Sequence, residues 1–136
     1  MAFGLKTLFG AFMKKGKKKK KKKKKVYAEN EQEDEEHIVS CITSLFHYTT
    51  DSRRIRLMHK FVEDSCAKTE RLAELHEKYS QLVGTCDKSI AAIVNYRNNS
   101  YEDYDAEEDR PEFEIMRLDA GLSVLQLTDV AIAYVL

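Results

Sequence analysis

The chain has 136 residues, the size of a single domain. Its formal net charge is zero, yet eleven of its 23 basic residues lie at positions 14–25, where there is no acidic residue. The remaining 12 basic residues stand against 23 acidic ones, a net charge of −11. This balance makes the chain a poor nucleic-acid platform, because phosphate binding needs lysine and arginine spread over a face. One proline and five glycines favour helices over a turn-rich β fold.

The three cysteines, Cys41, Cys66 and Cys86, are odd in number and far apart, which predicts reduced thiols of an intracellular protein. No apolar run approaches the roughly 20 residues that a membrane-spanning helix needs. The N-terminus has neither a basic n-region nor a cleavage signature, so we expect no signal peptide.

Residues 2–13 predict a short amphipathic helix, which is too short to be stable alone and must pack on something. Together with the basic run behind it, this helix could instead anchor a peripheral membrane protein on an acidic lipid surface. The same membrane would repel the acidic block that begins at Glu29, so we expect no membrane partner. The apolar positions are Phe3, Leu5, Leu8, Phe9, Phe12 and Met13.

Nine consecutive lysines, Lys17 to Lys25, follow Lys14-Lys15-Gly16. Because like charges repel one another and bury no apolar surface, we predict a disordered connector over residues 14–30. A basic cluster read as an extended peptide is also a candidate nuclear import signal. The candidate residues are Lys17, Lys18, Lys19, Lys20 and Lys21.

Apolar residues at helical spacing predict three helices after the connector, over residues 31–48, 53–63 and 66–96. Cap-forming residues precede the second and third helices, at Asp51-Ser52 and at Asp64-Ser65. The inward positions are Ile38, Val39, Ile42, Leu45 and Phe46, then Ile55, Met58, Phe61 and Val62, then Leu72, Leu75, Tyr79, Leu82, Val83, Cys86, Ile90, Ile93 and Val94.

An acidic loop is predicted over residues 98–109, and Pro111 then marks a new helix start. The segment that follows is apolar on nearly all sides, which predicts one buried helix. It stops in mid-pattern at Leu136, so we expect the domain of residues 31–136 to be truncated there.

Motifs of catalysis and metal binding are missing or incomplete. His37 and Cys41 lie four apart on one helix, but no second pair stands at ligand spacing, so a solvated His beside a core Cys is expected instead. His76-Glu77 begins like a zinc-protease motif, yet Ser80 stands where the second His should be. We therefore expect a helical scaffold, not an enzyme, with no cofactor and no metal.

Several stretches, in order along the chain, resemble the beta-catenin-like protein 1 family of nuclear armadillo-type proteins. Residues 117–126, Arg-Leu-Asp-Ala-Gly-Leu-Ser-Val-Leu-Gln, are the most specific of them. The others are Phe3 to Phe9, Glu35 to Ile42 and Arg71 to Tyr79. The resemblance implies an all-α, armadillo/HEAT-like helical-repeat fragment of about five helices, with residues 1–13 as the end of an armadillo-type helix.

The resemblance also implies a non-enzymatic adaptor of the pre-mRNA splicing machinery in the nucleus. Its expected partners are proteins of the spliceosomal nineteen complex and basic, import-signal-like peptides, including those of a Myb-like splicing factor; no direct nucleic-acid binding is expected. Acidic blocks at 29–36 and 102–109 suit a basic ligand, although solvated loops would look the same. The candidate partner-binding residues are Glu102, Asp103, Asp105, Glu107, Glu108 and Asp109.

Two features depart from the family pattern. The lysine run replaces a short, mixed basic connector, and we expect this chain to lack the upstream repeats and further C-terminal helices of full members. Because helical repeats bury their cores against neighbours, we expect Phe3, Phe9 and much of 122–136 to be exposed.

Overall fold

The computed structural model describes residues 2–14 and 24–136, with side chains for residues 4–14 and 30–136. Within this part of the chain there are five helices and no strand, as the all-α prediction requires. The helices are α1 (Ala2–Phe12), α2 (Lys24–Tyr48), α3 (Asp51–Ser100), α4 (Arg110–Asp119) and α5 (Leu122–Val135). Helix α2 begins at Lys24 and not near residue 31, so the predicted connector is shorter on its C-terminal side.

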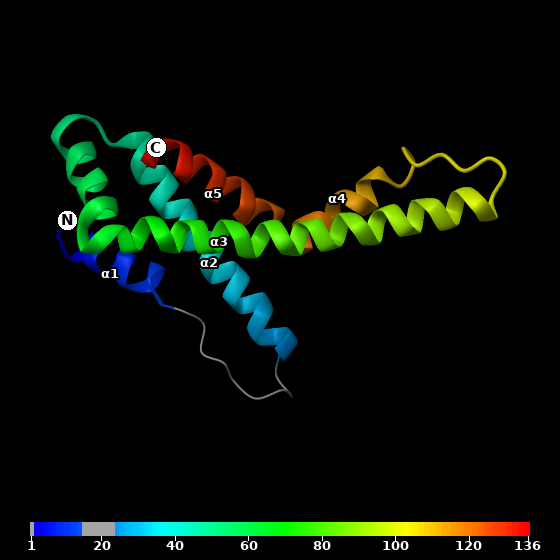
Figure 1. Cartoon of the computed structure of the whole chain (residues 1–136), viewed down its shortest axis with the longest axis horizontal. Helices are drawn as coiled ribbons and strands as arrows, with labels where there is room; N and C mark the ends of the chain where they lie inside the picture. Colours follow the sequence, from blue (N-terminus) through cyan, green and yellow to red (C-terminus); the bar gives the residue numbers. More distant parts are fainter. Residues whose placement is uncertain (1, 15–23) are drawn as a thin grey trace.

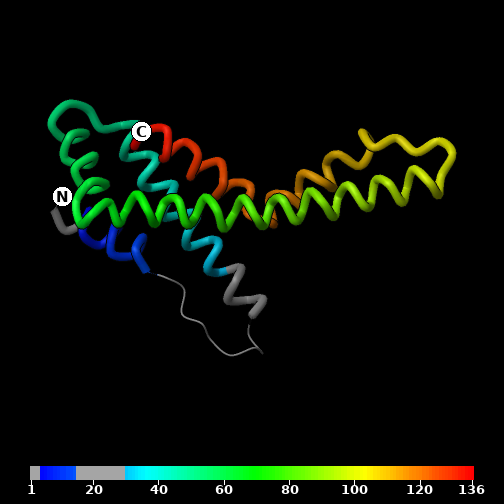
Figure 2. The backbone as a smooth tube through the Cα atoms, in the orientation of Figure 1, coloured from blue at the N-terminus to red at the C-terminus, as the bar shows by residue number. Residues whose placement is uncertain are grey.

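Helix α3 forms the long axis of the molecule, and the other helices are arranged along it (Figure 1). Helix α5 packs most extensively against α3 and α2, while α1 contacts α2. The distal part of α3 extends beyond this cluster, and α4 runs back beside it (Figures 1 and 2). We call residues 89–119, which comprise distal α3, the loop and α4, the arm, and the cluster of α1, α2, proximal α3 and α5 the packed end.

The core lies at the packed end and is built from the apolar stripes that the sequence predicts. On α2, Val39, Ile42 and Phe46 follow one another at helical spacing and are fully buried. Each large apolar side chain buried in this way contributes about 1.5–3 kcal/mol of transfer free energy. The buried residues of the core cluster are Phe9, Phe12, Val39, Ile42, Phe46, Leu57, Phe61, Leu72, Leu75, Tyr79, Val124 and Ala131.

A chain of aromatic rings joins four helices through this core. Phe9 of α1 meets Phe61 of α3 edge to face, with ring centroids 5.5 Å apart. Phe61 in turn lies 5.2 Å from Phe46 of α2, and Phe46 stacks on Tyr134 of α5 at 5.5 Å. Aromatic pairs at these distances stabilise a fold beyond their burial alone. The rings therefore fix α1 and α5 to the α2–α3 pair.

The predicted boundary between the second and third helices is confirmed as a break inside α3. Glu63 has an extended ψ of 164°, and Asp64, Ser65 and Cys66 all have left-handed φ values between 53° and 63°. Left-handed backbone costs about 1–2 kcal/mol per non-glycine residue, so neighbouring contacts must hold it. One such contact is the hydrogen bond from Thr69 Oγ1 to the Phe61 carbonyl at 2.8 Å.

The prediction of a single buried helix after Pro111 is wrong, because the segment breaks between α4 and α5. Gly121 has φ +102°, and a Cβ at this position would overlap the ring of Tyr79. Only glycine combines this backbone with so close an approach to the ring. Helix α4 is also largely exposed, as Ile115 and Leu118 show. The apolar residues of this segment thus do not form one continuous buried surface.

The expected exposure of Phe9 and of residues 122–136 is also incorrect. Phe9 is only 4% exposed, because α1 packs on α3 and the Phe9 ring contacts the ring of Phe61 in the core. In α5, Val124, Thr128 and Ala131 are buried, whereas Val130 and Leu136 remain exposed. The Phe3 side chain lies outside the described residues.

Within the described residues, no single helix has the length and hydropathy to cross a membrane. Helices α4 and α5 meet that test only together, as a pair bent by 66°. Phe9 and Phe12 face the core of the packed end, so these two apolar side chains of α1 are not available to a membrane anchor. The structure therefore gives no support to anchoring through this helix.

Candidate functional site

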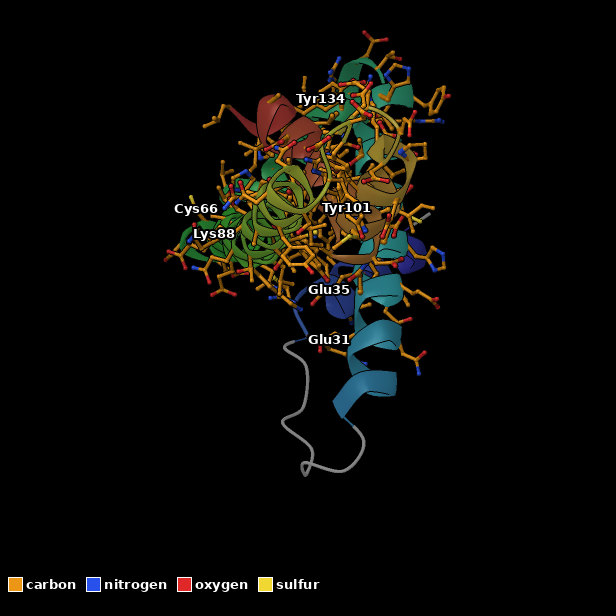
Figure 3. The ribbon with its side chains drawn as sticks, turned by 90° about the vertical axis from the view of Figure 1, so that its right-hand side faces the viewer. Glu31, Glu35, Cys66, Lys88, Tyr101 and Tyr134 are labelled. Atoms are coloured by element: carbon orange, nitrogen blue, oxygen red, sulfur yellow. The ribbon has the colours of Figure 1, made fainter. Side chains whose placement is uncertain are left out.

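A buried polar cluster ties three helices together at the packed end. The carboxylate of Glu35, which is 8% exposed, accepts hydrogen bonds from Lys78 Nζ at 3.0 and 3.1 Å and from the hydroxyl of Tyr79. Arg71 lies 3.6 Å from the same carboxylate and donates from Nε to the Phe12 carbonyl at 3.0 Å. The cluster thus connects the end of α1 with α2 and α3, and Figure 3 shows Glu35 on α2.

The polar cluster also explains why the glycine break lies where it does. The hydroxyl of Tyr79 is directed to Glu35, and its ring lies against Gly121. Burial, followed by the hydrogen bond to Glu35, raises the pKa of Tyr79, so the phenol stays protonated and donates. Every buried side-chain nitrogen or oxygen in the described residues has a hydrogen-bond partner. We interpret the cluster as an element that positions helices.

The arm is closed by ion pairs at its tip. Arg97, near the end of α3, pairs with Asp109 and with Glu112 at 3.5 Å, and Tyr104 donates to Asp109 at 2.7 Å. The pKa of Asp109 is lowered, first by the hydrogen bond from Tyr104 and then by the one from Arg97. At the base of the arm, Arg117 Nε donates to Asp87 at 2.7 Å. These contacts hold the loop at the far end of the long helix (Figure 1).

The six candidate acidic residues divide into three whose side chains make contacts within the arm and three whose side chains make none among the described residues. Asp109 is half-buried and paired with Arg97, Asp105 accepts a hydrogen bond from the Glu107 amide at 2.9 Å, and Glu107 lies 3.5 Å from Arg110. The loop conformation therefore uses these three carboxylates. Among the described contacts, the side chains of the remaining candidates are exposed and have no ion-pair or hydrogen-bond partner, although the Glu108 amide donates to the Asp105 carbonyl at 3.3 Å; they are Glu102, Asp103 and Glu108.

Exposed aromatic and aliphatic side chains on the arm were missed by the sequence interpretation. Tyr96 and Tyr101 are 69% and 62% exposed, and Ile115 of α4 is 60% exposed. Figure 3, which looks along the arm, labels Tyr101 at this end. The tyrosines alternate with acids in Tyr101-Glu102-Asp103-Tyr104, and that pattern could have indicated their position. Together with Glu102 and Asp103 they give the arm both charge and apolar surface.

The other acidic block, residues 29–36, is not an acidic loop. It belongs to helix α2, and two of its carboxylates face the core side: Glu35 in the polar cluster and Glu31, 3.2 Å from Lys78. Figure 3 shows Glu31 and Glu35 on the same stretch of α2. Glu33 and Asp34 are exposed. Much of this block is thus used for packing, and the arm is the better candidate for a basic ligand.

The other candidate residues fall into two groups. The candidate import signal, Lys17 to Lys21, lies outside the described residues, so both its role and the predicted disorder stay predictions. His37 and Cys41 are both exposed, which corrects the expected core position of Cys41. Within the part of the chain that the structure describes, no group of three His, Cys, Asp or Glu residues is placed to hold a metal ion.

The described residues form an all-α arrangement of five helices with an acidic arm, which is compatible with the expected armadillo-type helical-repeat fragment. A family model described as catenin-beta-like, Arm-motif containing and nuclear matches residues 1–136. The chain belongs to this catenin-beta-like family.

Curated relatives agree with the family match. Beta-catenin-like protein 1 of Bos taurus and that of Homo sapiens are each 41% identical to the chain over 125 residues, and that of Mus musculus is 39% identical. The matched region covers 90% of this chain and 21% of each relative, so the chain spans about a fifth of their length.

Proposed function

We propose that this chain is a non-enzymatic scaffold of the pre-mRNA splicing machinery in the nucleus, and that its arm binds basic segments of protein partners. Membership of a nuclear Arm-motif family supports a nuclear location and an armadillo-type scaffold. The expected partners are proteins of the spliceosomal nineteen complex that carry basic, import-signal-like peptides.

The observation that carries the proposal is the set of unpaired carboxylates at the tip of the arm. Glu102, Asp103 and Glu108 are exposed, and the ion pair of Arg97 with Asp109 holds the loop that bears them. A preorganised loop loses little conformational entropy when it binds a ligand. Acidic groups of this kind attract lysine- and arginine-rich peptides and accelerate their association.

The exposed tyrosines supply the second part of the recognition. Tyr96, near the end of α3, and Tyr101, which directly precedes Glu102 in the sequence, present aromatic rings to solvent. Arginine and lysine side chains bind carboxylates through their charged ends, and they also lie favourably over aromatic faces. A basic peptide can therefore make both kinds of contact on one arm.

A matched pair of triple variants tests this proposal. We would measure fluorescence anisotropy of a labelled lysine- and arginine-rich peptide of about ten residues, a length that spans the loop when extended. Glu102→Gln, Asp103→Asn and Glu108→Gln together should weaken binding about tenfold, because each partly exposed pair contributes roughly 0.2–1 kcal/mol. The control, Glu33→Gln, Asp34→Asn and Glu70→Gln, removes the same charge from exposed positions outside the arm.

Equal weakening by both triple variants would show that only net charge attracts the peptide, and would contradict the arm as the site. Binding should also weaken as salt increases, because the Debye length is about 10 Å at 0.1 M. Co-precipitation of nineteen-complex proteins from nuclear extract tests the splicing role; it should be lost with the arm variant and kept with the control.

A further inference from the structure

A second surface lies at the end of the molecule opposite to the arm. A hollow of about 480 Å³ opens between α1 and the proximal part of α3. We call it the basic groove, and its lining combines apolar and charged side chains. They are Leu5, Lys6, Phe9, Gly10, Met13, Arg56, Lys60, Glu63 and Lys68.

The charge of the basic groove is opposite to that of the chain outside the lysine run. Four cations line it against a single carboxylate, Glu63. The Glu63 carboxylate lies 3.3 Å from Lys60 and 3.2 Å from Lys68. Its pKa is lowered, mainly by the hydrogen bond from Lys68 and then by the one from Lys60. In the described residues, Lys6 and Arg56 are exposed and have no ion-pair partner. The groove therefore has positive charge that its own carboxylate does not balance.

Apolar surface accompanies this charge. Leu5, Phe9 and Met13 line the groove from α1, and the Lys68 ammonium lies 5.7 Å from the centroid of the Phe9 ring. Phosphate backbones offer nothing to pair with such side chains, whereas an amphipathic peptide does. This favours a protein ligand over a nucleic acid.

We propose that the basic groove binds an acidic amphipathic helix of a protein partner. Carboxylates of that helix would pair with Lys6 and Arg56, and its apolar side chains would lie over Leu5 and Met13. The hollow is of the size that buries a few side chains of a ligand. This interaction is independent of the arm, which attracts ligands of the opposite charge.

Two glycines of α1 provide a matched test. A Cβ at either Gly4 or Gly10 would meet nothing within 4 Å, but only Gly10 lines the groove. At both positions leucine is a better helix former than glycine. Gly10→Leu should fill the groove without disturbing the core, whereas Gly4→Leu should leave it open.

The probe is a fluorescent peptide of about 16 residues made of Glu, Ala and Leu, with leucines at i, i+3, i+4 and i+7, long enough to form a helix. Anisotropy should show that Gly10→Leu weakens binding at least tenfold while Gly4→Leu changes it less than about twofold. Arg56→Glu, on a different helix, should weaken binding at least as much as Gly10→Leu. Circular dichroism would show that each variant stays folded.

A scrambled peptide of the same composition separates the groove from the lysine run, which is intact in every variant. Equal binding of both peptides, or equal effects of the two glycine variants, would overturn the proposal. The proposal would also be overturned if an oligouridylate or phosphatidylserine vesicles bound more tightly than the peptide and Gly10→Leu abolished that binding. The groove would then belong to those ligands. Concentration-dependent dimerisation in sedimentation velocity that Gly10→Leu abolishes would overturn the proposal too, because a second copy would then occupy the groove.

Discussion

The packed end and the arm are built from the same long helix, yet they use their residues in different ways. At the packed end, α3 contributes Leu72, Leu75 and Tyr79 to a core shared with α1, α2 and α5. In the arm, the described residues that are buried and apolar are Ile90 of α3 and Phe113 of α4. The packed end is therefore held by apolar burial and the arm largely by surface ion pairs.

This difference separates the residues that stabilise the chain from the residues that are offered to partners. Carboxylates at the packed end, such as Glu35, are used inside the fold, whereas Glu102 and Asp103 of the arm face solvent. Substitutions at the packed end should then change the free energy of unfolding strongly. Substitutions at the tip of the arm should change binding and leave unfolding nearly unaffected.

The largest effect is expected at Gly121. Gly121→Ala would place a Cβ against the ring of Tyr79 on a backbone of φ +102°, so both the steric overlap and the backbone strain oppose it. We expect a loss of about 2–4 kcal/mol in the free energy of unfolding, measured by urea denaturation. Gly84→Ala is the control, because nothing lies within 4 Å of its Cβ in the helix. That change should stabilise the chain by about 0.5–1 kcal/mol.

If Gly121→Ala were neutral, the tight contact between Tyr79 and the α4–α5 break would not hold in solution. A loss of stability that was confined to the arm, with an unchanged unfolding transition of the packed end, would also contradict this contact. The Gly84 control distinguishes a general effect of adding a methyl group from the local overlap.

The next effect in size is expected at Glu35. Glu35→Gln keeps the shape of the side chain but removes the charge that Lys78 and Arg71 share. Because the mostly buried Arg71 would keep only its pairing with Glu74 at 3.5 Å, the change should cost about 1–3 kcal/mol, with the half-exposed Lys78 contributing little. Glu33→Gln, on the exposed side of the same helix, should stay within about 0.5 kcal/mol. Equal effects of the two changes would mean that the polar cluster adds no specific stability.

Much of the helical architecture could be predicted from the sequence, because amphipathic periodicity and caps are local signals. The break in α3 falls at the predicted cap residues Asp64 and Ser65, although their left-handed backbone is not the extended conformation of a helix N-cap. The α4–α5 break was missed, because the need for glycine at 121 comes from the ring of Tyr79, which is distant in sequence. No local pattern contains that contact.

The candidate site shows the same limit. The sequence indicates where the acids are, but not which of them find partners after folding. Glu35 meets Tyr79 across 44 positions, and Asp109 meets Arg97 across 12. The sequence interpretation therefore counted Asp109 with the exposed acids, and it placed Glu35 near the start of a predicted helix without indicating its partners. The burial of Phe9 was missed for a similar reason, because it depends on Phe61 of another helix.

The smallest effect is expected at the tip of the arm and depends on pH. The pKa of Asp109 is lowered by Tyr104 and Arg97, so the carboxylate form is favoured in the folded loop. A lowered pKa stabilises the loop at pH values above the ordinary value of about 3.8, and this contribution is lost as pH falls through the lowered pKa. Amide exchange of the loop should accelerate over that range while the packed end stays protected.

Asp109→Asn should accelerate exchange at neutral pH and remove the pH step, whereas Asp103→Asn should leave both unchanged. A pH step that persists in Asp109→Asn would assign the titration to another carboxylate and leave the arm closed by other contacts.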